Sequence, residues 1–292
     1  MISKLMAVIM ALVSLISGFG ADLPQKTEIC YDVAYGTSER QVIDVTFPKK
    51  YAKKRGVVLF IHGGAWIGGT KDDFKKRLTG LSDKWGCITV SMNYRYVSDE
   101  LDCSDVLDDI DDALKKVKSM AKTRGITTTK VMLTGYSAGA HLAMLYAYTR
   151  KNTAPIKPGA VASFSGPVNL AGYEFVMENS LSGPEYMLRL MSYLTGEQIT
   201  AENFKSKKKV LLKYSPTNYV SSACVPTIIL QGKKDDIVPP VDTRNFVEKL
   251  KSKGVTYEYY ELPNSAHSLK SDPKVYAKGA KAFVEYLDKY IK

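Results

Sequence analysis

Short apolar runs alternate with longer amphipathic stretches along most of the chain. Apolar runs of four to eight residues are typical of strands buried on both faces of a sheet, and the longer stretches have the spacing of surface helices. The predicted strands span 29–35, 41–47, 57–62, 87–93, 130–134, 160–165, 226–231 and 256–262. The predicted helices span 71–84, 104–124, 137–149, 241–253 and 273–291.

This order of elements predicts an α/β fold. Strands that alternate with helices form parallel pairs in one sheet. The first two strands are separated by the turn residues Gly36-Thr37-Ser38, which predicts an antiparallel hairpin at one edge. We therefore expect one domain, residues 22–292, with an eight-stranded, mostly parallel sheet and helices on both faces.

The alternation stops after the sixth predicted strand. Residues 167–224 contain helix-like pieces, such as Pro184–Leu194, but no strong strand signal. Ligands bind α/β sheets at the carboxyl ends of the strands. We therefore expect residues 167–224 to form a small, cap-like insertion over that edge.

The first twenty-one residues have the layout of a secretory signal peptide. Lys4 precedes the apolar run Leu5–Ile16, and small residues follow. The run is too short for an ordinary transmembrane helix. We expect cleavage of residues 1–21, a secreted or periplasmic location and no stable membrane insertion afterwards; an uncleaved N-terminal anchor is the alternative.

Composition and charge narrow the class of protein. The chain has 292 residues, of which 45% are hydrophobic and 24% charged, as in ordinary globular proteins. The net charge is +11, but the lysines are scattered and no nucleic-acid-binding motif accompanies them. We expect no nucleic-acid partner and interpret the charge as a solvated surface, while attraction to an acidic polysaccharide stays open. None of the four cysteines forms a C-x-x-C pair, which argues against a metal cluster. No cofactor is expected.

The strongest chemical signal is a G-x-S-x-G motif, residues 135–139, centred on Ser137. An apolar strand precedes it and a helical pattern follows, which is the context that a catalytic serine requires. A strand that turns directly into a helix holds the serine in a strained, exposed conformation, and only small neighbours let the backbone pass. The sequence therefore predicts Ser137 as a nucleophile, with the N–H of Ala138 facing the reacting oxygen.

A serine nucleophile needs a base, and the chain has three histidines. His141 follows Ser137 by one helical turn, behind the nucleophile, and His62 ends the third predicted strand. His267 lies in a separate loop after the last strand, from which it can reach the upper edge of the sheet. We predict His267 as the general base.

The base needs an orienting acid, and the oxyanion needs donors. Asp235 and Asp236 follow the seventh predicted strand, and on local grounds either could orient His267. Gly63 and Gly64 follow the third strand, where glycines let backbone N–H groups face a developing negative charge. Together with Ala138, they are predicted to form an oxyanion hole.

These segments resemble the α/β-hydrolases, and within them the carboxylesterase branch with a His-Gly-Gly oxyanion motif. The resemblance covers nearly all of the chain after residue 21. It rests on the segments His-Gly-Gly-Ala-Trp (62–66), Gly-Tyr-Ser-Ala-Gly (135–139) and Gly-Lys-Lys-Asp-Asp-Ile-Val-Pro (232–239), and also on Asn-Tyr-Arg (93–95) and Ser-Pro (215–216).

The resemblance implies several further properties. The spacing of the acid loop selects Asp235 over Asp236, and the α/β-hydrolase fold follows from the family. Trp66 and Tyr136, within the matching segments, are expected to contact the substrate. The chain departs from the family pattern at Ala65, where lipase-like members have a third glycine, and at Ala266, where glycine usually precedes the histidine. Small acetyl- or feruloyl-type carbohydrate esterases and kynurenine-formamidase-like enzymes are the implied relatives.

Three functions are consistent with these residues. The first is a serine carboxylic-ester hydrolase that removes short acyl groups, acetyl or feruloyl, from plant polysaccharide or from a small ester. The second is an arylformamidase-type amide hydrolase, against which the predicted export argues. The third is a non-catalytic binding protein on the same fold, which the complete set of catalytic residue types disfavours.

Overall fold

The computed structural model describes residues 27–48, 54–172 and 183–291. The predicted signal peptide therefore lies outside the described residues. The strands are β1 (Glu28–Ala34), β2 (Val42–Phe47), β3 (Lys54–Ile61), β4 (Ile88–Met92), β5 (Thr127–Tyr136), β6 (Pro158–Phe164), β7 (Thr227–Gly232) and β8 (Tyr257–Leu262). The helices are α2 (Asp72–Trp85), α3 (Cys103–Thr123), α4 (Ala138–Thr149), α5 (Pro184–Thr195), α6 (Lys208–Lys213), α7 (Pro240–Ser252) and α8 (Pro273–Tyr286).

The strands form one eight-stranded sheet in the order β1-β2-β4-β3-β5-β6-β7-β8. β1 pairs antiparallel with β2, and β2 pairs antiparallel with β4. The pairs from β4 to β8 are parallel. The eight-stranded, mostly parallel sheet predicted from the sequence is thus confirmed, including the antiparallel hairpin at its edge.

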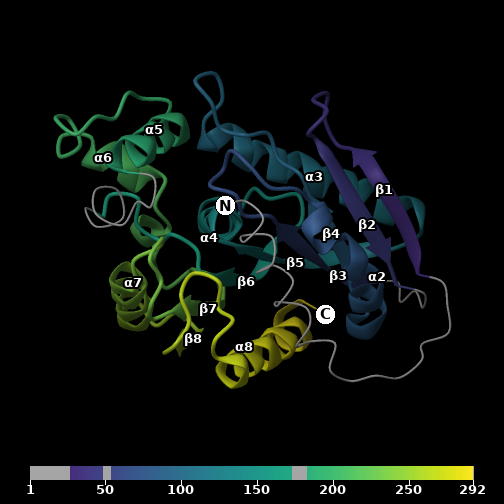
Figure 1. Ribbon diagram of the computed structural model, residues 1–292. Helices are drawn as coiled ribbons and strands as arrows, with labels where there is room; N and C mark the ends of the chain where they lie inside the picture. Colours follow the sequence, from purple (N-terminus) through teal and green to yellow (C-terminus); the bar gives the residue numbers. More distant parts are fainter. Residues whose placement is uncertain (1–26, 49–53, 173–182, 292) are drawn as a thin grey trace.

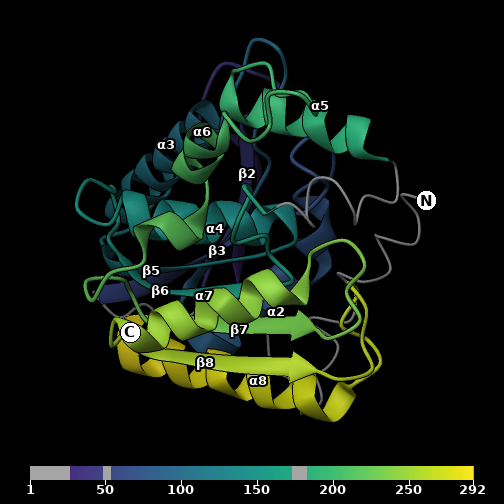
Figure 2. The same ribbon diagram turned by 90° about the vertical axis from the view of Figure 1, so that its left-hand side faces the viewer.

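Helices cover both faces of this sheet, as Figures 1 and 2 show. One core joins the sheet to α3, α4 and α7, and the other joins it to α2 and α8. The central strands are buried throughout, since every residue of β4, β6 and β7 is shielded from solvent. This explains why these strands are apolar runs rather than alternating patterns. In Figure 2, β7 and β8 lie between α7 and α8, so the last two helices take opposite faces.

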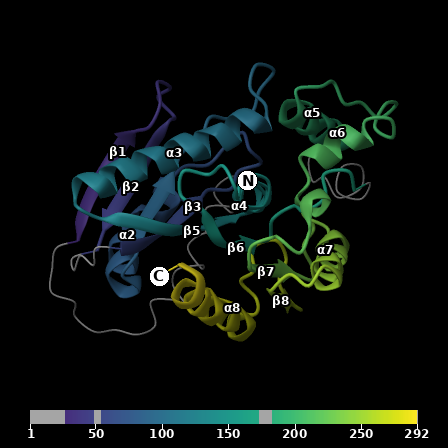
Figure 3. The ribbon, with the colours of Figure 1, turned by 180° about the vertical axis from the view of Figure 1, so that it is seen from behind.

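The predicted insertion is built from short helices. α5 and α6 lie together beyond the start of α3 (Figures 1 and 3), and the 3₁₀ turn η2 (Pro216–Tyr219) leads back to the sheet. The Tyr214 hydroxyl donates to a carboxylate oxygen of Asp102, the N-cap of α3, at 3.1 Å. The insertion is thereby attached to the core on the side of α3 and α4. Residues 173–182, within its expected span, lie outside the described residues.

Several element boundaries differ from the sequence prediction, most of all at the starts of β3 and β5 and at the end of the last helix. β5 begins at Thr127, three residues earlier than expected, because its polar start pairs with the first residues of β3. The last helix, expected to run to residue 291, ends at Tyr286 and continues as the π-helical turn Leu287–Ile291. Leu287 and Ile291 are buried in that turn, so tertiary packing sets its form.

No helix among the described residues is long and apolar enough to cross a membrane. All four cysteines are free thiols, and Cys87, Cys103 and Cys224 are buried.

Candidate active site

The G-x-S-x-G motif forms the sharp turn between β5 and α4. Ser137 has φ 54° and ψ −123°, which is a strained backbone for a residue with a side chain. The two glycines permit this turn. A Cβ at Gly135 would lie 2.4 Å from the carbonyl carbon of Gly139, and a Cβ at Gly139 would lie 2.1 Å from the carbonyl oxygen of Ile61. The end of β3 therefore passes too close for any larger residue.

We predict opposite stability effects for two glycine-to-alanine substitutions in helices. Gly139→Ala should lower the free energy of unfolding by about 1–3 kcal/mol, since the added Cβ overlaps backbone atoms. Gly80→Ala is the matched control in α2, because nothing lies within 4 Å of the added Cβ. It should raise the free energy of unfolding by about 0.5–1 kcal/mol. Urea unfolding of both variants tests the pair, and a stabilising Gly139→Ala would contradict the close approach of β3.

Three segments that are distant in the sequence bring Ser137, His267 and Asp235 together. Nε2 of His267 lies 3.0 Å from Oγ of Ser137. Nδ1 of the same ring lies 2.9 Å and 3.1 Å from the two carboxylate oxygens of Asp235. If Nδ1 donates to Asp235, Nε2 is left as an acceptor for the serine hydroxyl, which is the arrangement of a Ser-His-Asp triad. Ser137 is half-buried, whereas the side chain of Asp235 is fully shielded.

The structure also separates Asp235 from Asp236. The backbone N–H groups of Ile237 and Val238 donate to one oxygen of Asp235, at 3.0 Å and 2.9 Å. The amide of Gln231 donates to the other oxygen at 2.7 Å. These donors hold the carboxylate against His267, while Asp236 is exposed to solvent. The geometry therefore favours Asp235, in agreement with the spacing of the acid loop.

The loop that carries His267 packs directly on the end of β7. A Cβ at Gly232 would lie 2.4 Å and 2.5 Å from the carbonyl oxygens of Ala266 and Ser265. The carboxylate of Asp272 closes the loop, since it accepts hydrogen bonds from the N–H of Asn264 and the hydroxyl of Ser265. The acid turn and the histidine loop are thus fixed against each other.

The two residues expected to contact substrate, Trp66 and Tyr136, are both buried. Trp66 and Tyr136 are 2% and 1% exposed, so their side chains lie in the interior. The Tyr136 hydroxyl donates to the carbonyl oxygen of His267 at 2.9 Å, and the indole N–H of Trp66 donates to Nδ1 of His141 at 3.1 Å. Both side chains therefore support the site from the interior, and substrate contact by either stays a prediction.

A second hydroxyl, that of Ser165, donates to the carbonyl oxygen of His267 and was not predicted from the sequence. Ser165 donates from Oγ at 3.1 Å, and its backbone has φ 51° directly after β6. Burial, and secondarily the charge of Asp235, raise the pKa of Tyr136 well above its usual range, so its hydroxyl stays a donor. The position of Ser165 and Gln231 at the carboxyl ends of buried strands is the signal that could have identified them.

The turn that carries the predicted oxyanion donors Gly63 and Gly64 begins beside the nucleophile. A Cβ at Gly63 would lie 2.9 Å from the carbonyl oxygen of Tyr136 and 3.4 Å from Cβ of Ser137. The turn continues through Gly64, with φ 116°, and Ala65, with φ 51°. Ala65 thus adopts a left-handed conformation at the position where the lipase-like pattern has glycine. Within the described residues, the backbone N–H groups of Gly63, Gly64 and Ala138 make no hydrogen bond, which leaves them available to an anion.

The other two histidines belong to the interior. Burial lowers the pKa of His62 to about 3 and that of His141 to about 4. Both rings are therefore neutral near pH 7. His62 stacks on Tyr94, and His141 lies between the Trp66 indole and the carbonyl of Tyr214. The partners of these two rings are interior groups and not the hydroxyl of Ser137, in agreement with the choice of His267 as the general base.

Among the described residues, no group of three or more His, Cys, Asp or Glu side chains is placed to hold a metal ion.

Fold and site geometry together define an α/β-hydrolase with a Ser-His-Asp arrangement at the carboxyl edge of its sheet. The chain belongs to the BD-FAE family, whose sequence model matches residues 43–250.

Similar proteins support this class. The chain is 28% identical to Esterase LipQ of Mycobacterium tuberculosis over 241 residues, which cover 81% of this chain and 56% of the relative. The chain therefore spans little more than half the length of that relative. A truncated carbohydrate esterase from gut microbiota has the same fold, with a TM-score of 0.73 at 20% identity over 93% of this chain and 100% of the other. Esterase Est2 of Thermogutta terrifontis, solved with propionate bound, gives a TM-score of 0.67 at 22% identity over 90% and 94%.

Proposed function

We propose that this protein is a serine carboxylic-ester hydrolase. The observation that carries the proposal is the continuous hydrogen-bonded arrangement of Ser137, His267 and Asp235, with distances of 3.0 Å and 2.9 Å. The position of the Gly63 backbone against Ser137 adds the means to stabilise an oxyanion. The names of two similar proteins of Mycobacterium tuberculosis, Esterase LipQ and Probable carboxylic ester hydrolase LipM, agree with this chemistry.

Each residue has a defined part in the proposed reaction. Oγ of Ser137 attacks the acyl carbonyl while Nε2 of His267 takes the hydroxyl proton. The N–H groups of Gly63, Gly64 and Ala138 donate to the oxyanion of the tetrahedral intermediate. His267 passes the proton to the leaving alcohol, and an acyl-enzyme remains on Ser137. Water, deprotonated by His267, then attacks the acyl-enzyme, and His267 returns the proton to Oγ of Ser137 as the acid leaves. Asp235 keeps the imidazole in the required tautomer and stabilises its cation.

The proposed substrates are short acyl esters, with acetyl or feruloyl groups on plant polysaccharide as the favoured natural case. Propionate bound to the similar esterase Est2 supports a small acyl group, and the similar gut carbohydrate esterase supports a sugar alcohol. We further propose a secreted or periplasmic location, on the basis of the N-terminal sequence. The names of LipQ and LipM favour the ester over the formamide alternative. The assembled Ser137, His267 and Asp235 argue against a non-catalytic binding protein.

The acyl preference is tested with a series of 4-nitrophenyl esters. We expect kcat/KM to be highest for acyl chains of two to four carbons and roughly tenfold or more lower at eight carbons, because a small acyl site gains nothing from added methylenes and must exclude them. Acetylated and feruloylated xylan extend the series to polymeric substrates. A maximum at eight carbons or more would contradict the short-acyl proposal, and no hydrolysis of any ester would contradict the enzymatic proposal itself.

A further inference from the structure

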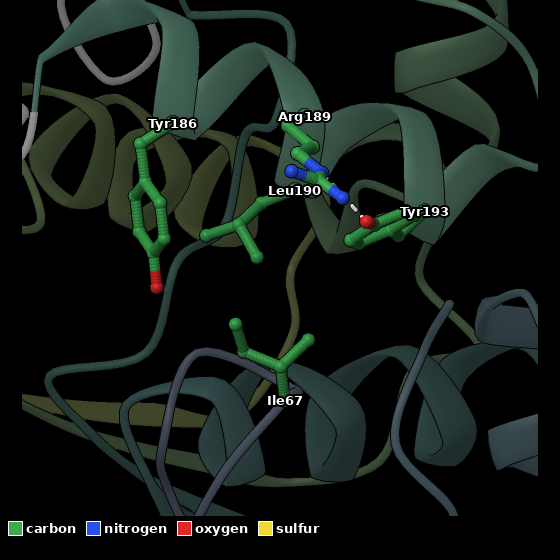
Figure 4. Close-up of a pocket in the computed structure, with 5 residues that line it drawn as sticks. All are labelled: Ile67, Tyr186, Arg189, Leu190 and Tyr193. Carbon is green, nitrogen blue, oxygen red and sulfur yellow. Dashed lines mark hydrogen bonds between the residues drawn. The ribbon is translucent and has the colours of Figure 1, made fainter. Parts of the chain in front are cut away.

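Helix α5 presents one face to the loop that follows β3. Tyr186, Arg189, Leu190 and Tyr193 have the spacing i, i+3, i+4 and i+7, which places them on one side of the helix. Together with Ile67 from that loop they line a pocket of about 200 Å³, which we call the α5 pocket. Figure 4 shows Leu190 and Ile67 facing each other, with Tyr186 on one side and Arg189 beside Tyr193 on the other.

One wall of the α5 pocket belongs to the turn that carries the predicted oxyanion donors. Ile67 belongs to the same turn as the glycine donors, since its N–H donates to the carbonyl of Gly64 at 3.2 Å. The preceding residue, Trp66, anchors this turn to His141 within α4. A substrate whose ester bond lies at Ser137 can therefore extend past the glycine turn and reach α5.

Arg189 is the charged side chain of the α5 pocket. Its side chain is exposed, and Nε donates to the Tyr193 hydroxyl at 2.6 Å. That bond directs the guanidinium while leaving its terminal N–H groups to other partners. Within the part of the chain that the structure describes, no carboxylate forms an ion pair with Arg189, and this includes Glu185 one turn earlier on α5. The pocket thus combines an oriented cation with aromatic and aliphatic walls.

We propose that the α5 pocket is a substrate subsite for a carboxylate-bearing group, of which a uronic-acid sugar is the favoured form. The inference rests on the proposed esterase function and adds a charge preference to it. The planar guanidinium of Arg189 matches a carboxylate with two parallel hydrogen bonds. Tyr186 and Ile67, which are exposed and partly exposed, offer apolar surface to the C–H face of a sugar ring. The volume is below the roughly 300–1,000 Å³ of sites for drug-sized ligands, which suits a single small ring.

The net charge of the chain also favours acidic substrates. With a formal net charge of +11, the protein attracts acidic substrates at a distance, and Arg189 supplies the local contact. A neutral aromatic acyl group could also pack on the two tyrosines, but it would make no use of the oriented guanidinium. A carboxylate carried on a sugar ring accounts for both the guanidinium of Arg189 and the apolar walls of the pocket.

The test compares matched substrates that differ in charge. The alcohol-side pair is O-acetyl galacturonic acid against O-acetyl galactose, and the acyl-side pair is monoethyl succinate against ethyl butanoate. We expect the wild-type protein to prefer the acidic member of at least one pair by about tenfold or more in kcat/KM, mainly through KM. Salt raised from about 0.05 M to about 0.5 M should weaken this preference through screening. The pair that shows the preference identifies which side of the ester carries the carboxylate.

Substitutions in α5 then assign the effect to the pocket. Arg189→Met should lower kcat/KM for the preferred acidic substrate by about 10- to 30-fold, and for its neutral partner by less than threefold. Arg189→Lys keeps the charge but loses the planar fork, so its loss should be smaller. Tyr193→Phe removes the hydroxyl that directs Nε and should cost about three- to tenfold on the acidic substrate alone. Lys281→Met, an exposed cation on α8, removes the same charge elsewhere and should leave the preference unchanged.

Two results would overturn the inference. One is a wild-type protein that hydrolyses the neutral esters but shows no preference for the acidic member of either pair. The other is an equal effect of Arg189→Met on both members of a pair, which would assign a merely structural role to Arg189. Failure of the proposed esterase function is distinguishable from both, since hydrolysis of 4-nitrophenyl acetate would then be absent in the wild-type protein.

Discussion

Replacement of Ser137 by alanine is expected to lower kcat on 4-nitrophenyl acetate by roughly 10⁴- to 10⁶-fold. The loss is this large because no other nucleophile in the site can form the acyl-enzyme, so only water attack assisted by the oxyanion donors would remain. The KM should change little, since the hydroxyl contributes mainly in the transition state. Steady-state kinetics, combined with mass spectrometry after treatment with an organophosphate, measure both the rate and the covalent modification of Ser137.

The matched control is Ser206→Ala. Ser206 is exposed and its hydroxyl donates only to the backbone carbonyl of Asn203, so activity should stay at the wild-type level. Near-full activity of Ser137→Ala, or organophosphate addition at another serine, would remove Ser137 from the proposed mechanism.

The second large effect is expected from a comparison of two neighbouring aspartates. Asp235→Asn should lower kcat/KM by roughly 10³- to 10⁴-fold. An asparagine amide can donate to Nδ1 of His267, which would move the ring proton to Nε2 and prevent it from accepting the serine proton. Asp236→Asn should change kcat/KM by less than about threefold, because an exposed charge in water acts weakly on the site.

The two variants differ by one position in the same turn and remove the same charge, so Asp236→Asn controls for overall electrostatics. Circular dichroism and urea unfolding verify that both proteins are folded. Equal losses in the two variants would leave the acid unassigned, and a larger loss in Asp236→Asn would transfer the role to that residue.

Local sequence patterns predicted most of the fold. The apolar runs identified the central strands, because a strand buried on both faces favours apolar side chains wherever it lies in the chain. The partly exposed strands β1 and β8 were identified instead by their β-branched and aromatic residues. The turn at Ser137 could also be predicted, since Gly135 and Gly139 are needed for backbone contacts within a few residues and with the end of β3. The sequence could not predict the sheet order, in which β3 lies between β4 and β5, because pairing between distant strands leaves no local signature.

The candidate site was also predictable from the sequence only in part. The residue types and their chain order identified Ser137, Asp235 and His267 as candidates, and the structure brings these three side chains within hydrogen-bond distance. Their catalytic roles stay predictions until the variants are measured. Trp66 and Tyr136 were placed beside the substrate by their motif neighbours, yet their side chains point into the interior, because an aromatic ring next to a glycine turn gains more from burial than from solvent.

By itself, the sequence determined the class of fold, the strained serine turn and the short list of groups that can carry out acyl transfer. Those features depend on residue type and spacing over a few positions. Only the tertiary structure decided how Gln231 and Ser165 support the acid and the histidine, and how α5 brings Arg189 to the glycine turn. Each of these contacts joins residues that folding, not sequence proximity, makes neighbours.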